Sequence, residues 1–287
     1  MAQPTRSRFE LVLLLAASAT EIGTMRWFQL TIAYDGGAFV GWQVQANGRS
    51  VQQVLEDAIH GVTGERMRVT ASGRTDSGVH ALGQVVSFAS ATRLSAERLQ
   101  AALNATLPHD VVVLDCRARA GEFHAIRDCT RKRYRYLIHN SPVRSVFARQ
   151  YAWHCPKPLD VAAMQQAAEP LLGRHDFSSF ESTGAERLDS IRTVYELSVE
   201  AGPIDEQRAP LAHRADVAIA GRQITIEIEA DGFLYNMVRA IVGTLVEVGR
   251  GAEQVTWPGE VLAACDRTQA GPTAPPHGLY LLRVWYE

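Results

Sequence analysis

Short stretches rich in hydrophobic residues, separated by turns and helices, predict strands in the first half of the chain, while at residues 224–229 in the second half hydrophobic and polar residues alternate cleanly. The first stretch, residues 27–34, runs into an Asp-Gly-Gly turn. Further strands are expected at residues 67–71, 84–89, 111–114 and 134–138. Apolar residues three and four positions apart predict two helices in this half, which begin after the N-cap residues Ser50 and Ser95. The first helix is expected to end at Gly61 or Gly64.

The second half of the chain contains elements of the same kinds, although its sequence does not repeat the first half. Helices are expected at residues 159–172 and 234–248, and strands at 194–199, 224–229 and 279–285. Runs of strands with few helices are typical of an α+β protein with largely antiparallel sheet, and they argue against a doubly wound parallel sheet. We therefore expect an α+β fold of two similar halves, residues 25–150 and 151–287.

The overall charge gives no sign of a polyanionic partner, because the formal net charge is −2. Any nucleic-acid binding must come from a local patch. Such a patch lies between Phe123 and Gln150, where Asp128 is the single acid among basic and aromatic residues: Arg127, Arg131, Lys132, Arg133, Arg135, Arg144 and Arg149, with Phe123, Tyr134, Tyr136 and Phe147. Guanidinium groups neutralise phosphates and aromatic rings stack on bases. A solvated strand face explains the same pattern equally well.

The N-terminal residues 1–24 imitate a secretory signal, since two arginines precede the apolar run 11–17. The run is too short to cross a bilayer as a helix. Glu10 abuts the run, and Met25 stands just before the first strand. These two features favour a disordered N-terminal extension of a cytoplasmic protein over an exported one, with no membrane attachment.

The four cysteines are widely spaced and form no C-x-x-C pair: Cys116, Cys129, Cys155 and Cys265. A chain of this length does not need disulfides to fold, so free thiols in a reducing compartment are expected. The adjacent His154 and Cys155 would be part of a zinc site only if distant ligands joined them. We therefore predict no metal.

The segment Gly73 to His80 (GRTDSGVH) is a first candidate for chemistry. Its glycine spacing matches neither a dinucleotide fingerprint nor a phosphate-binding loop. It places Asp76 close to Arg74 at a loop tip, where catalytic carboxylates commonly lie. A tight turn without chemical function is the alternative, because Gly, Asp and Ser also favour turns.

The segment Asp231 to Arg239 (DGFLYNMVR) is the second candidate, and it opens an apolar helix. Helical spacing puts Tyr235, Arg239 and Val242 on one side. Arg239 would then be the buried cationic partner of a carboxylate, which it would keep ionised. Alternatively, this is a core helix whose arginine extends to water.

These segments belong to an ordered set of seven motifs that resembles the tRNA pseudouridine synthase A family. The motifs are Tyr34-Asp35-Gly36 with Gly41-Trp42-Gln43, GRTDSGVHA (73–81), KRYRY (132–136), HDFSSF (175–180), DGFLYNMVR (231–239), GTLVEVG (243–249), and AGPTA (270–274) with Gly278-Leu279. Each motif is weak alone, but their order and spacing make the match specific. The resemblance covers nearly the whole chain, from about Trp27 to Glu287.

The resemblance implies an isomerase that converts uridine to pseudouridine at positions 38, 39 and 40 of the tRNA anticodon stem-loop, without cofactor or metal. It implies that Asp76 is the catalytic nucleophile and that Arg239 is its partner. Tyr134 is expected to stack on the flipped uracil, Arg74 to enter the RNA stem, and Leu279 to form a pocket wall. The family further implies that the two halves of the chain join around a central RNA-binding cleft, and that the protein is a homodimer. The preferred position, and the choice between attack on the sugar and attack on the base, stay open.

Further contacts with tRNA are expected from the basic stretch, namely from Phe123, His124, Arg127, Arg131 and Lys132. The chain departs from the family here. Members usually read Phe-His-Ala-Arg, whereas this chain has Ile126 in the fourth position and an arginine one residue later. We expect Arg127 or Arg131 to replace the lost contact.

Two other functions are compatible with parts of this pattern. A non-catalytic tRNA-binding or folding module would share the architecture, but it would not need Asp76, Arg74, Tyr134 and Arg239 together. An exported hydrolase, suggested by the N-terminus, would need a nucleophile and base that the sequence does not offer. The combination therefore favours the synthase.

Overall fold

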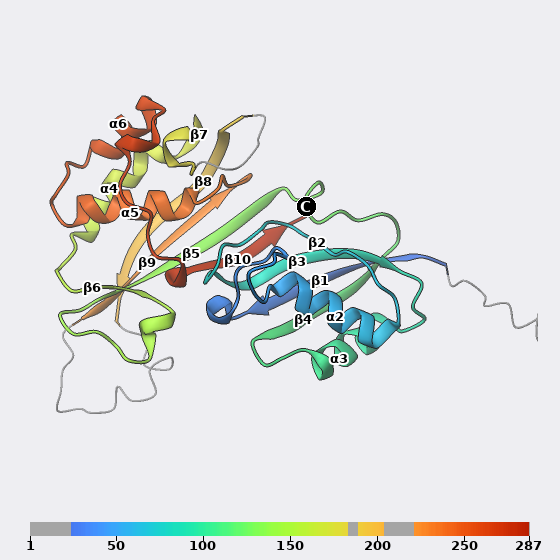
Figure 1. Ribbon diagram of the computed structural model, residues 1–287. Coiled ribbons are helices and arrows are strands. Elements are labelled where there is room, and N and C mark those ends of the chain that lie inside the picture. The colour runs from blue at the N-terminus through green and yellow to red at the C-terminus, as the bar shows by residue number, and fades with distance from the viewer. Residues whose placement is uncertain (1–23, 183–188, 204–220, 287) are drawn as a thin grey trace, which may run out of the picture.

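The computed structural model describes residues 24–182, 189–203 and 221–286, which form one ten-stranded sheet flanked by helices (Figure 1). The strands are β1 (Arg26–Tyr34), β2 (Thr70–Ala71), β3 (His80–Ser90), β4 (Val111–Arg119), β5 (Arg131–Asn140), β6 (Trp153–Cys155), β7 (Gly173–Asp176), β8 (Ile191–Gly202), β9 (Arg222–Ala230) and β10 (Leu279–Trp285). The helices are α2 (Val51–Thr63), α3 (Ala96–Thr106), α4 (Val161–Ala168), α5 (Met237–Gly249) and α6 (Trp257–Ala264).

The strand order is β4-β1-β3-β10-β5-β9-β8-β7, with β2 beside β3 and β6 beside β5. Most pairs are antiparallel; β10 is parallel to β3, and β6 is parallel to β5. Helices α2 and α3 cover one end of the sheet, while α4, α5 and α6 cover the other (Figure 1). The α+β class with a largely antiparallel sheet is confirmed.

The strand β10 lies between β3 and β5, so residues that are far apart in the sequence meet at the centre of the sheet (Figure 1). Leu281 pairs with Ala81 on one side and with Tyr134 on the other. One hydrophobic core extends from Phe28 near the start of the chain to Leu245 in α5. The sheet is thus continuous across residue 150, and the division into halves at that position stays a prediction.

Local sequence signals explain where several elements begin and end. Ser50 caps α2 by accepting a hydrogen bond from the Gln53 N–H at 3.3 Å. The helix ends at Gly64, which has a φ of 76°, and not at Gly61. The helix expected at 159–172 is shorter, because Pro170 has no N–H to donate and the chain continues as a 3₁₀ turn.

Some strands are longer than their sequence pattern indicates, and some elements were missed. β3 begins at His80, four residues earlier than expected, because its first residues pair with β10. β2 is only two residues long. The short strands β6 and β7 and the helix α6 carry too little periodicity to be predicted.

The N-terminal extension predicted at residues 1–24 lies, apart from residue 24, outside the described residues. Within the described part of the chain, no helix is both long and apolar enough to cross a membrane.

Candidate active site

Asp76 lies in the loop that connects β2 to β3, here called the Asp76 loop (residues 72–79). Its Oδ2 accepts a hydrogen bond from Arg239 Nη1 at 3.0 Å. The side chain of Asp76 is 28% exposed, so the carboxylate faces solvent on one side and a guanidinium on the other. The structure therefore brings together the two residues that the sequence predicted as a pair, although 163 positions separate them.

The Asp76 loop is held by residues of the first motif, to which the sequence assigned no role. The Tyr34 hydroxyl lies 2.8 Å from Thr75 Oγ1 in a buried contact. Burial raises the pKa of Tyr34 to about 12, so its hydroxyl stays protonated and able to donate. The backbone N–H of Trp42 donates to the backbone carbonyl of Thr75 at 3.0 Å. Both contacts fix the residue that precedes the carboxylate.

Two glycines of the same motif let the backbone approach the Asp76 loop closely. A Cβ on Gly36 would lie 2.0 Å from the carbonyl oxygen of Val79. Gly41 has a φ of +108°, and a Cβ there would lie 2.7 Å from the Thr75 carbonyl oxygen. A side chain at either position would push the loop away. The motif at residues 34–43 therefore packs against the Asp76 loop and holds it in place.

Arg239 projects from the first turn of α5 and makes three contacts through two of its nitrogens. Nη1 donates both to Asp76 and to Asn236 Oδ1, the latter at 2.7 Å. Nε donates to the carbonyl of Ala274 at 2.7 Å. The alternative of an arginine that merely extends from a core helix to water does not fit, since Arg239 is bonded on several sides.

The segment 270–274 packs against α5 and so supplies one of these contacts. A Cβ on Gly243 would lie 1.6 Å from the carbonyl oxygen of Pro272. Thr244 Oγ1 accepts from the Gly271 N–H at 3.0 Å. The glycine-containing motifs at 243–249 and 270–274 therefore serve close packing beside Arg239.

Tyr134 lies on β5 and is buried, with its ring edge-on to Phe233 at a centroid distance of 5.0 Å. Burial raises the pKa of the Tyr134 hydroxyl, and the nearby Tyr34 and Asp76 raise it further. Tyr134 is therefore a neutral aromatic surface close to the carboxylate. Phe233, which sequence reasoning did not single out by itself, completes this aromatic corner.

Leu279 opens β10 opposite Tyr136 in the register, so it is a diagonal neighbour of Tyr134 on the same face of the sheet. It is buried. Lys132 also shares this face, and its Nζ lies 3.6 Å from the position of a Cβ on Gly73, at the start of the Asp76 loop. Lys132 thus lies near the start of the Asp76 loop, and Leu279 lies beside the tyrosines of β5.

Arg74 is exposed at the tip of the Asp76 loop, two residues before the carboxylate. Within the described part of the chain we find no hydrogen bond or ion pair for its guanidinium. An exposed arginine without a protein partner is available to an incoming anion.

The turn at 122–128 is held by its own polar groups. His124 Nδ1 accepts from the N–H groups of Ile126 and Arg127, and Asp128 accepts from the His124 N–H at 2.8 Å. Arg127 forms ion pairs with Asp128 at 3.1 Å and with Glu122 at 3.3 Å. Ile126 is 55% exposed. Arg127 is therefore already paired, and its role as a replacement contact stays a prediction.

Phe123 is buried, with its ring packed edge-on against Tyr286 and beneath the guanidinium of Arg119. In this position the ring supports the turn. The RNA contact predicted for Phe123 would need the turn to move.

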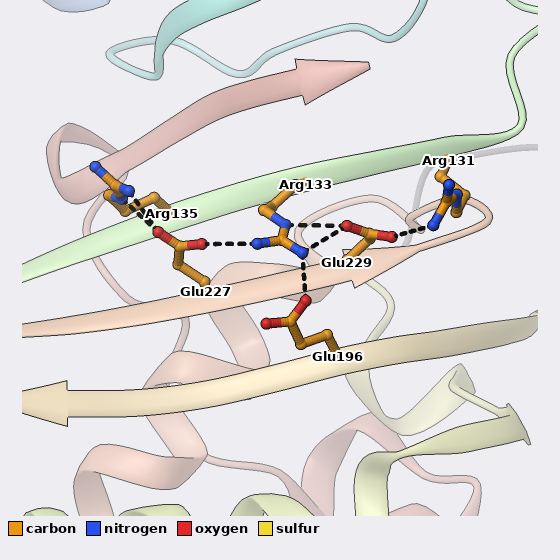
Figure 2. A network of polar contacts seen from close by, with 6 residues as sticks. All are labelled: Arg131, Arg133, Arg135, Glu196, Glu227 and Glu229. Carbon is orange, nitrogen blue, oxygen red and sulfur yellow. Dashed lines mark hydrogen bonds and ion pairs between the residues drawn. The ribbon is translucent and has the colours of Figure 1, made fainter. Parts of the chain in front are cut away.

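The arginines of β5 form a ladder with glutamates of β8 and β9, and the basic patch is neutralised there (Figure 2). Glu229 pairs with Arg131 at 2.9 Å and with Arg133 at 2.7 Å. Arg133 also pairs with Glu227 at 3.3 Å and with Glu196, and Glu227 pairs with Arg135 (Figure 2). We call these six residues the arginine–glutamate ladder: Arg131, Arg133, Arg135, Glu196, Glu227 and Glu229.

The arginine–glutamate ladder lies on the face of β5 opposite Tyr134, because side chains alternate along a strand. The stretch that suggested a polyanion patch is, along β5, a strand face with matched charges. Sequence reasoning missed the acids because they belong to other strands. The contact of Arg131 with tRNA stays a prediction.

The cysteines are free thiols, as predicted. Burial is the largest cause of the raised pKa of Cys116, about 12, and the carboxylates of Asp115 and Glu97 raise it further. Among the described residues, no three His, Cys, Asp or Glu side chains gather as metal ligands. His154 instead bonds the carbonyl of Ser141 at 2.8 Å.

The fold and the site present one partly exposed aspartate carboxylate, which an arginine holds near an aromatic surface. A profile of the tRNA pseudouridine synthase family matches residues 30–126 and 167–287. The chain belongs to this family.

Named relatives agree with this assignment. The chain is 44% identical over 262 residues to tRNA pseudouridine synthase A of Thermoanaerobacter sp. (strain X514), which covers 91% of this chain and 100% of that protein. It is 45% identical over 262 residues, with the same coverage, to the protein of that name from Brevibacillus brevis. It is 43% identical over 259 residues to the one from Myxococcus xanthus, which covers 90% of this chain and 91% of that protein. The family and the class of enzyme predicted from the sequence, an isomerase, are confirmed.

Proposed function

We propose that this protein isomerises uridine to pseudouridine at positions 38, 39 and 40 in the anticodon stem-loop of tRNA, with Asp76 as the nucleophile. The observation that carries the proposal is the geometry of Asp76, which is paired with Arg239 through Oδ2 at 3.0 Å yet 28% exposed. The names of the relatives support tRNA as the substrate.

The reaction requires one carboxylate and a firm hold on the base. The N1–C1′ bond of the nucleotide breaks, the uracil turns over, a C5–C1′ bond forms, and the proton from C5 is lost while N1 gains one. No electrons are exchanged overall. Asp76 would attack either C1′ of the sugar or the uracil ring, and an ionised carboxylate serves both routes. The guanidinium of Arg239 favours the ionised form.

The neighbouring residues fit the steps that precede chemistry. A base inside a duplex must be flipped out before an enzyme can act on it. We assign the flipped uracil to the surface of Tyr134, with Leu279 as a further wall of the pocket. Arg74 would occupy the stem in place of the departed base, because its guanidinium is exposed near Asp76. Lys132 would bind phosphate near the Asp76 loop.

We further propose a homodimer in the cytoplasm. Three large apolar side chains of one segment stand open to solvent: Val143, Val146 and Phe147, which are 64%, 63% and 49% exposed. Clustered exposed apolar side chains are typical of interaction surfaces. Sedimentation of the full chain at micromolar concentration tests this proposal, and a monomer would contradict it.

The catalytic proposal is tested by release of tritium from tRNA labelled at C5 of uridine. The parent protein should release label, whereas Asp76→Asn and Asp76→Ala should release none. Both variants should bind tRNA within a few-fold of the parent, because phosphate contacts supply most of the affinity. Substantial release by Asp76→Ala would refute the role of Asp76. Binding without release by the parent would indicate a non-catalytic tRNA-binding module.

A further inference from the structure

Asn236, at the start of α5, has a backbone conformation that few residues adopt. Its φ is 62°, in the left-handed region, and in the described part of the chain the other non-glycine residue of this kind is Cys265, with a φ of 49°. This conformation costs a typical L-residue about 1–2 kcal/mol, and asparagine tolerates it better than most. The side chain of Asn236 does not cap α5. A different role must account for it.

Both ends of the Asn236 amide are engaged by other side chains. Oδ1 accepts from Arg239 Nη1 at 2.7 Å, and Nδ2 donates to Ser182 Oγ at 3.0 Å. The guanidinium can only donate, so the amide oxygen must face it, and the amide nitrogen must face the serine. Asn236 therefore offers Arg239 an acceptor whose direction is fixed.

This acceptor determines how Arg239 meets Asp76. Nη1 is shared between Asn236 and Asp76 Oδ2, while Nε is held by the carbonyl of Ala274. An arginine fork that is free to turn tends to pair with both oxygens of a carboxylate. Here the guanidinium touches Oδ2 alone, and among the described residues we find no hydrogen bond to Oδ1.

We propose that Asn236 is a positioning residue that restricts Arg239 to a single contact with Asp76 and so leaves Oδ1 free to react with the uridine. This inference rests on the proposed function, in which Asp76 is the nucleophile. The left-handed backbone of Asn236 lets its amide reach the side chain of Arg239, three residues further along the chain. Without the amide, the guanidinium would turn and cover both carboxylate oxygens.

The rival explanation is that Asn236 is needed only because it tolerates a positive φ. Asn236→Gly separates the two explanations, since glycine adopts this backbone without strain but has no amide. If only the backbone matters, Asn236→Gly should keep the parent's turnover. If the amide positions Arg239, kcat should fall on the order of 10- to 100-fold, as expected for a misplaced catalytic group. KM for tRNA and the melting temperature should stay close to those of the parent.

Cys265→Gly is the matched control. Cys265 is also left-handed and lies at the C-terminal end of α6, outside the Asp76 site. The Cys265→Gly variant shows how the introduction of a glycine at a positive φ affects stability, and it should leave kcat unchanged. Asn236→Asp is a second variant of the same size. Its carboxylate would compete with Asp76 for Arg239, so kcat should fall again.

Initial rates of tritium release over a series of tRNA concentrations up to saturation give kcat and KM for all variants, with Asp76→Ala measured in parallel. Full kcat in Asn236→Gly, with Asp76→Ala inactive, would overturn the positioning role and leave the proposed function standing. Activity in Asp76→Ala would overturn the proposed function itself. A fall in kcat for Asn236→Gly with unchanged KM and melting temperature, but not for Cys265→Gly, is the result we expect.

Discussion

The arginine–glutamate ladder offers a matched pair of substitutions, because Glu229 and Glu196 both pair with Arg133 but differ in burial. The side chain of Glu229 is 5% exposed, whereas that of Glu196 is 52% exposed. Glu229→Gln keeps the shape of the side chain, but it leaves either Arg131 or Arg133 facing an amide NH₂ group. Breaking a fully buried pair costs about 3–5 kcal/mol. Because Arg131 and Arg133 are 46% and 25% exposed, water replaces part of the loss.

We therefore expect Glu229→Gln to lower the free energy of unfolding by about 2 kcal/mol. In a protein of this size that corresponds to a fall in melting temperature of roughly 4–8 °C. Glu196→Gln should cost about 0.5 kcal/mol, as surface pairs do, or roughly 1–2 °C. Thermal unfolding followed by circular dichroism measures both. Equal losses for the two variants would show that burial of Glu229 does not govern the strength of the ladder.

Three further predictions address the loop support, the RNA contacts and the N-terminus. Gly36→Ala should destabilise the protein by about 1–3 kcal/mol and reduce turnover, because the new methyl meets the backbone behind Asp76; unchanged melting and kcat would contradict this. If Arg127 binds a phosphate, Arg127→Ala should flatten the slope of log affinity against log salt by about one unit with turnover intact, while Tyr134→Ala should lose turnover with the slope unchanged. The parent's slope and affinity in Arg127→Ala would exclude the replacement contact. A protein that starts at Met25 should be folded and active, since residues 1–24 precede all the motifs; detection in the periplasm of a form cleaved near residue 19 would contradict this reading.

The sequence could predict the pairing of Asp76 with Arg239, because the ordered set of seven motifs resembles a family in which these two residues are partners. It could not predict what holds that pair. The contact of Tyr34 with Thr75 depends on how the first motif folds over the Asp76 loop, and the amide of Asn236 depends on a backbone angle. Neither leaves a periodic signal.

The charged residues of β5 are a second case in which the sequence alone does not predict which side chains pair. Clustered arginines are visible in the sequence, and so is the alternation at 224–229, which includes Glu227 and Glu229. Whether these acids face the arginines is decided by the pairing of Arg133 with Glu229 and of Arg135 with Glu227 in the β5–β9 register. Register is a property of the assembled sheet. A basic stretch therefore cannot be assigned to RNA until its neighbours are known.

The central place of β10 has a consequence for synthesis on the ribosome. Tyr134 and the Asp76 loop are translated long before Leu281. Yet β10 lies between β5, which carries Tyr134, and β3, which follows the Asp76 loop, and it aligns the two strands. Until it emerges, β3 and β5 present unpaired edges, which in a nascent chain invite association with other chains. The Asp76 loop and Tyr134 are therefore aligned only after Trp285 has been translated, and a chain cut short before β10 would lack this arrangement.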